Sequence, residues 1–67
     1  MRRLVIKNAS STELGVMLEP WCDREDVEAG GQVTIVGDFA DEELIIDFGD
    51  ECFLSVWTPP GCTLRKN

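Results

Sequence analysis

With 67 residues and a formal net charge of −7, the chain is long enough for one domain with a small core, and its surface repels the phosphates of nucleic acid. It contains no histidine, which removes the commonest general base and most zinc sites. No apolar run approaches the length that spans a bilayer, so we expect a soluble protein with no membrane partner. We also expect no cofactor, and the cysteines described below favour a cytoplasmic setting.

The charges are unevenly distributed along the chain. Five of the six basic residues lie near the two ends, and between Asn8 and Leu64 one base, Arg24, stands against all thirteen acids, a net charge of −12. Such acidity most often serves as a solvated surface that keeps a protein soluble. Two other interpretations stay open, a surface that binds a cation and a surface that occupies a basic protein.

The first part of the sequence predicts two strands joined by a polar loop. Residues 1–7 and 13–19 alternate between apolar and polar side chains, the second stretch with Leu14, Val16 and Leu18 on one side. Pro20 ends this second strand because proline has no N–H to donate to a ladder. Residues 8–12 are small and hydrogen-bonding, and we expect them to close an antiparallel hairpin. The second strand is the one around which the other elements are predicted to assemble.

The middle of the chain predicts two more strands. Residues 21–26 are mostly charged, so we expect a loop that leads into a short strand centred on Val27. Gly30 and Gly31 predict a turn, because glycine reaches positive φ without a steric penalty. A strand follows from Gln32, with Val33 and Ile35 facing inward. Residues 37–43 are the most acidic stretch, and they are predicted to form a loop with at most one helical turn.

The turn between residues 44–48 and 52–57 decides which side chains are buried. A two-residue turn would put Leu44, Ile46 and Phe48 on the same face as Phe53 and Trp57, whereas a three-residue turn pairs them with Cys52, Leu54 and Val56. A slip of one residue exchanges core and solvent faces. We predict the three-residue turn, Gly49 to Glu51, because it gives the cleaner apolar face. The outer face then carries Ile45, Asp47, Phe53, Ser55 and Trp57.

Together with a turn at 58–61 and a short strand at 63–65, these elements predict one all-β domain over residues 1–67. It should have six or seven short, mainly antiparallel strands that form a small sandwich or a flattened barrel. The strand ending in Leu18-Glu19-Pro20-Trp21, with the glycine turn that follows, resembles a pattern in small bacterial β proteins of uncharacterised function. The resemblance covers about the first half of the chain, and it implies the fold and a bacterial origin but no activity.

The cysteines do not form a recognisable framework. Their number is odd, they have no Cys-x-x-Cys spacing, and no motif places a base beside one of them. We therefore expect a reduced, non-catalytic protein in which Cys52 is a small core residue. Pairing of Cys22 with Cys62, which both lie in predicted turns, stays open.

The acidic loop offers an alternative function. Its carboxylates could ligate a divalent metal ion or a cationic ligand, although their spacing does not match an EF-hand. The candidate ligands are Asp38, Asp41, Glu42 and Glu43.

The aromatic residues carry the main functional hypothesis. Four of them fall outside the predicted core: Trp21, Phe39, Phe53 and Trp57. Exposed aromatic side chains are enriched at the centres of protein interfaces. We therefore predict an interaction module that binds a second copy of itself or another protein, with a site formed by Trp57, Phe53, Ile45 and Trp21. The alternative is a two-sided core in which a second sheet or a loop covers these rings.

Overall fold

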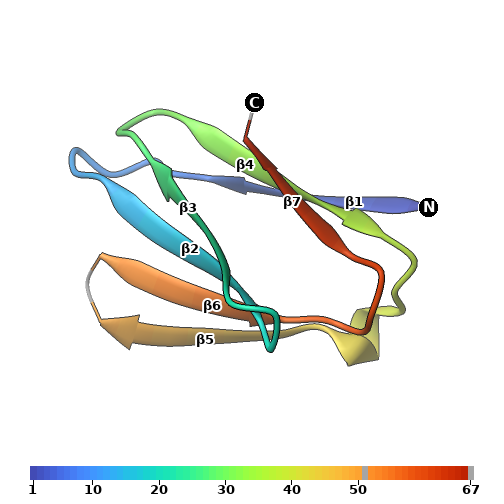
Figure 1. Ribbon diagram of the computed structural model, residues 1–67. Coiled ribbons are helices and arrows are strands. Elements are labelled where there is room, and N and C mark those ends of the chain that lie inside the picture. Colours follow the sequence, from blue (N-terminus) through green and yellow to red (C-terminus); the bar gives the residue numbers. More distant parts are fainter. Residues whose placement is uncertain (51, 67) are drawn as a thin grey trace.

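The computed structural model describes residues 1–50 and 52–66 and is an all-β sandwich of two packed sheets (Figure 1). The elements of this part of the chain are β1 (Arg2–Lys7), β2 (Leu14–Glu19), β3 (Asp23–Val27), β4 (Gln32–Gly37), the 3₁₀ turn η1 (Asp41–Glu43), β5 (Ile45–Asp50), β6 (Phe53–Trp57) and β7 (Thr63–Lys66). The predicted fold class is confirmed. In the described residues no helix has the length and apolar character needed to cross a membrane.

One sheet has three strands and the other has four. The three-stranded sheet has the order β1-β4-β7 and is antiparallel throughout. The four-stranded sheet has the order β3-β2-β6-β5, and its only parallel pair within the described residues is β2 with β6. The four-stranded sheet therefore has one strand more than the sheet that packs against it.

Strand β2 is central to the four-stranded sheet, as its sequence predicts. It pairs with β3 on one side and β6 on the other, and Val16 and Leu18 are fully buried. The predicted hairpin with β1 is wrong, because β1 pairs with β4 in the opposite sheet. A loop of this length can cross between two sheets as well as close a hairpin. The crossing is fixed at Asn8, whose N–H donates to the carbonyl of Gly31 at 2.9 Å.

Strand β3 begins earlier than the charge pattern suggested. The predicted loop over residues 21–26 is strand from Asp23 onward, because β3 is an edge strand and edge strands tolerate charged side chains. Arg24 and Asp26 form an ion pair of 3.0 Å at its surface. The helical turn of the acidic stretch is η1, a single 3₁₀ turn.

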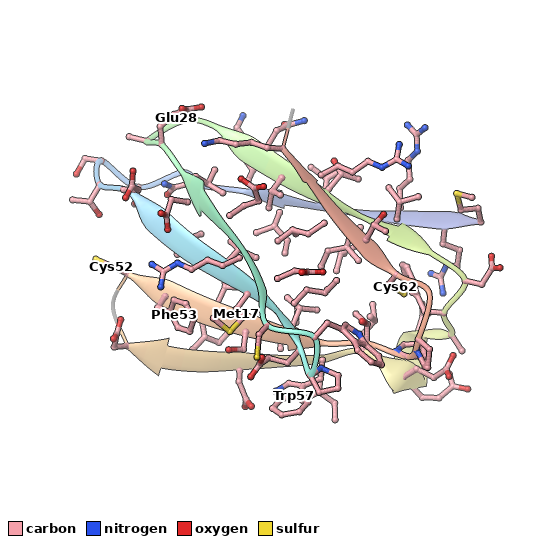
Figure 2. All side chains as sticks on the ribbon, viewed as in Figure 1. Met17, Glu28, Cys52, Phe53, Trp57 and Cys62 are labelled. Carbon is pink, nitrogen blue, oxygen red and sulfur yellow. The ribbon has the colours of Figure 1, made fainter. Side chains whose placement is uncertain are left out.

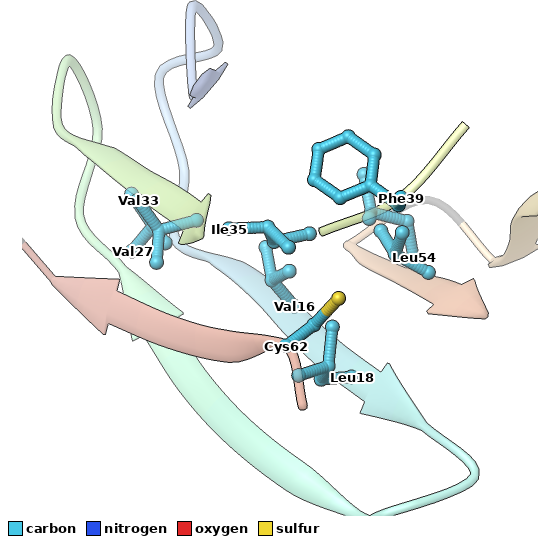
Figure 3. Packing of buried hydrophobic residues seen from close by; sticks show 9 residues of the cluster. Val16, Leu18, Val27, Val33, Ile35, Phe39, Leu54 and Cys62 are labelled. Atoms are coloured by element: carbon cyan, nitrogen blue, oxygen red, sulfur yellow. The ribbon is translucent and has the colours of Figure 1, made fainter. Parts of the chain in front are cut away.

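The core lies between the two sheets (Figure 3). It contains inward-facing residues of both, among them Val27, Val33 and Ile35, all fully buried. Phe39, which the sequence placed outside the core, is buried among them. Phe39 lies in the segment between β4 and η1. Arg2 stacks on the Phe39 ring at 4.9 Å, and its Nη1 donates to the Phe39 carbonyl at 2.9 Å.

The β5–β6 pairing keeps the predicted faces but not the predicted partners. Ile46 and Phe48 share a face with Leu54 and Val56, as expected, yet Phe48 lies opposite Leu54 rather than Cys52. Strand β5 continues through an irregularity to Asp50, and Glu51 of the predicted turn lies outside the described residues. Cys52 precedes β6 and is exposed, so its assignment to the core is wrong.

The sandwich is closed on the side of β3 and β7. The Lys66 ammonium of β7 donates to the carbonyl of Asp26 in β3 at 2.7 Å and so joins the two sheets at this edge. On the other side, β1 and β5 are the outer strands of their sheets (Figure 1). Because the four-stranded sheet extends one strand further, the core-facing side of β5 has little to pack against.

Candidate functional site

Three of the four predicted site residues lie at one end of the four-stranded sheet. Ile45 and Trp57 are neighbours in the β5–β6 ladder, 58% and 38% exposed. Trp21 is 44% exposed and lies in the turn after β2, two residues beyond Glu19, which is the register partner of Trp57. The Trp57 indole N–H donates to Asp47 Oδ2 at 3.1 Å, which satisfies its polar atom and leaves the ring partly open. We refer to Trp21, Ile45 and Trp57 as the tryptophan corner.

Phe53, the fourth predicted residue, is partly covered within its own molecule. It lies on the outer face, as expected, but the guanidinium of Arg24 stacks over its ring at 5.1 Å. Gly15 makes room for this stack, since an added Cβ there would lie 2.8 Å from both Arg24 and Phe53. Phe53 and Trp57 lie at opposite ends of β6 (Figure 2). Phe53 therefore does not belong to the tryptophan corner.

The aromatic side chain with the highest exposed fraction is one that the sequence assigned to the core. Phe48 points to the core-facing side of β5 but is 78% exposed, and Ile46 beside it is 44% exposed. Together with β1 they border a hollow of about 400 Å³. We call this surface the open side and define it by five of its lining residues, Leu4, Val5, Ile6, Ile46 and Phe48. No local signal could have found it, because alternation gives the face of a strand and not whether another sheet covers that face.

A second, smaller hollow lies on the outer face of the three-stranded sheet. It has a volume of about 250 Å³, with Arg3 and Arg65 among its lining residues. They extend from β1 and β7 on either side of the central strand β4. Neither arginine forms an ion pair with an acidic side chain of the described residues. This face is therefore a basic surface on an acidic protein.

The acidic loop does not bring its carboxylates together. Asp38 pairs with the N-terminal ammonium at 3.2 Å, Asp41 pairs with Arg2 at 2.6 Å, and Glu43 accepts the N–H of Ala40 at 2.7 Å. Across residues 1–50 and 52–66, no three Cys, Asp or Glu side chains are grouped closely enough to hold a metal ion. The loop carboxylates instead hold the N-terminus and η1 in place.

The three cysteines are free thiols, two of them exposed and one buried. Cys22 and Cys52 are exposed, and Cys62 is buried against Gly37. The negative charge of Glu19, with a smaller contribution from Asp23, raises the pKa of the Cys22 thiol. A reactive cysteine needs the opposite shift, because the thiolate is the nucleophile.

Comparison of the chain with models of protein families, with curated proteins and with solved structures found no match.

Proposed function

We propose that this protein is a non-catalytic interaction module that associates with itself through the open side. The observation that supports this proposal is the position of Phe48. Its side chain points to the core-facing side of the sheet, yet the ring is mostly exposed because no other described segment of the monomer covers it. An apolar side chain in this position favours burial against a partner. Ile46 on the same face, and Leu4 and Ile6 across the hollow, would extend the buried surface.

The backbone on this side also favours a partner. Within the described residues β1 pairs only with β4, and β5 pairs only with β6. Each outer edge therefore carries unpaired N–H and C=O groups, which folded proteins usually protect. A second copy can cover both edges through one two-fold interface. The three free thiols fit a reducing, cytoplasmic setting for such an assembly.

Phe48→Thr tests the proposal, since threonine keeps the preference for strand and removes the ring. Burying a phenylalanine side chain contributes about 2 kcal/mol. Both copies of a symmetric dimer lose the ring, so the variant should raise the Kd of self-association about a thousandfold. Sedimentation equilibrium over a wide range of concentration measures this change. The variant should keep the far-UV circular dichroism of the parent protein, because Phe48 contributes little to the monomer core.

Trp57→Ala is the matched comparison at the tryptophan corner. If the open side is the interface, this variant should affect the Kd much less than Phe48→Thr does. The opposite ranking would move the interface to the tryptophan corner. A parent protein that stays monomeric at every concentration would contradict self-association altogether.

A further inference from the structure

The two sheets carry opposite charges. The strands of the three-stranded sheet contain five basic residues and no acid, whereas those of the four-stranded sheet contain six acids and one base, Arg24. The net charges of the strands are therefore +5 and −5. The sequence alone did not show this separation, because topology places β1 and β7, from the two ends of the chain, in one sheet.

The open side is bordered by one strand of the basic sheet and one strand of the acidic sheet. Its upper rim is β1, whose outer face presents Arg3 and Lys7, both exposed. Its lower rim is β5, which presents the exposed carboxylates of Asp47 and Asp50. The apolar residues of the hollow lie between a basic rim and an acidic rim.

A second copy can face this side in two symmetric ways. A two-fold axis perpendicular to the sheets would place β1 beside β1 and β5 beside β5, so that basic residues meet basic residues and acids meet acids. A two-fold axis along the strands places β1 of one copy beside β5 of its partner, so that opposite charges meet at both rims. Juxtaposed like charges across an interface cost several kcal/mol. The charges therefore favour the second arrangement.

We infer that the partner at the open side is a second copy whose β5 lies beside β1 of the first. This inference rests on the proposed function and adds the orientation and the recognition chemistry. The inner faces then match as well as the rims, since Leu4 and Ile6 of β1 lie next to Ile46 and Phe48 of the partner copy. Each three-stranded sheet continues into the four-stranded sheet of the other copy, and both hollows are covered.

Charge exchange tests this arrangement. A base-reversed variant, Arg3→Glu with Lys7→Glu, has two acidic rims, and an acid-reversed variant, Asp47→Lys with Asp50→Lys, has two basic rims. Each alone should show a Kd of self-association raised more than about tenfold. An equimolar mixture should form a heterodimer as tight as the parent dimer, because every rim again meets its opposite. Heterodimer formation would also show that both variants are folded.

A chain that carries all four changes is the control for the substitutions themselves. It has an acidic β1 and a basic β5, so opposite charges meet again at both rims and it should dimerise with itself as the parent protein does. Sedimentation velocity on the parent protein, the two reversed variants, their mixture and the chain with all four changes gives the result. If the parent protein dimerises but the two reversed variants dimerise equally well, the inferred orientation is wrong and the proposed function stands. If the parent protein is a monomer, the proposed self-association is itself contradicted.

If Asp47→Lys prevents folding because it removes the acceptor of the Trp57 indole N–H, the single variants Lys7→Glu and Asp50→Lys replace the paired variants.

Discussion

Asn8 joins parts of the chain that are distant in sequence. It is buried, and its Nδ2 donates to the carbonyls of Thr12, Val27 and Glu28 at 2.8–3.1 Å. Its Oδ1 accepts from both the N–H and the hydroxyl of Ser10. One side chain thus connects the β1–β2 loop to the turn between β3 and β4. A buried amide with this many partners is difficult to replace, because its removal leaves carbonyls without donors.

Asn8→Ala should therefore lower the free energy of unfolding by about 3 kcal/mol, since three carbonyls, in one buried and two partly buried contacts, lose their donor at once. Urea unfolding followed by tryptophan fluorescence measures the change. Ser11→Ala in the same loop is the matched control, because Ser11 is exposed, and its effect should stay within about 0.5 kcal/mol. A loss below about 1 kcal/mol for Asn8→Ala would contradict this account of the loop.

The Cys22 thiol gives a pH-dependent readout of its carboxylate neighbour. Glu19 raises the pKa of Cys22 because a negative charge disfavours the thiolate. Glu19→Gln removes that charge, so the pKa should fall and alkylation by iodoacetamide at mildly alkaline pH should become faster. The rate-against-pH curve of Cys22, followed by mass spectrometry, should shift to lower pH. Exposed Cys52 is the internal control, and an equal shift at both sites would show a general effect on the fold.

The end of β4 and the chain entering β7 lie so close together that there is no room for a side chain at Gly37. A Cβ added at Gly37 would lie 2.6 Å from Cys62 Sγ and 2.9 Å from Cys62 Cα. The end of β4 and the chain entering β7 would have to separate, and Cys62 is part of the buried core. A glycine is therefore required here for contact between elements.

Gly37→Ala should lower the free energy of unfolding by about 1–3 kcal/mol, the usual cost of overpacking. Chemical denaturation measures it. Gly49→Ala is the control, because a Cβ there meets only Phe53, at 3.8 Å, and little change is expected. Similar losses at both glycines would mean that backbone freedom, and not the contact with Cys62, is what matters at Gly37.

The elements also show what sequence patterns could predict. Alternation identified β2 and the faces of β5 and β6, because the side-chain period of a strand is a local property. It could not show that β1 pairs with β4, since a loop of small polar residues permits a hairpin and a crossing equally. It also could not show that Phe48 is exposed or that Phe39 is buried. Both depend on which segment lies opposite, and that is decided by contacts between residues distant in the sequence.

The small core of this protein makes its stability sensitive to association. A domain of this size buries a modest fraction of its surface, and a partner that binds only the folded state adds stability by mass action. The open side is the part of the described structure where the core itself is incomplete. Covering Phe48 and Ile46 would therefore extend the core as well as form an interface.

The melting temperature of the parent protein should therefore rise with protein concentration, and that of Phe48→Thr should not. Differential scanning calorimetry at a tenfold range of concentration checks this. Trp21→Ser, at the tryptophan corner, is the control and should keep the concentration dependence. A melting temperature that is independent of concentration in the parent protein would mean that the open side stays uncovered in solution.

The opposite charges of the two sheets give the monomer a permanent electric dipole moment directed from one sheet to the other. A single molecule should therefore adopt a defined orientation at any charged surface, with the four-stranded sheet towards a cationic resin and the three-stranded sheet towards an anionic one. Despite a sequence pI near 4.2, local attraction through Arg3, Lys7 and Arg65 would then slow its passage over a cation exchanger at low ionic strength, an effect that salt screening would abolish.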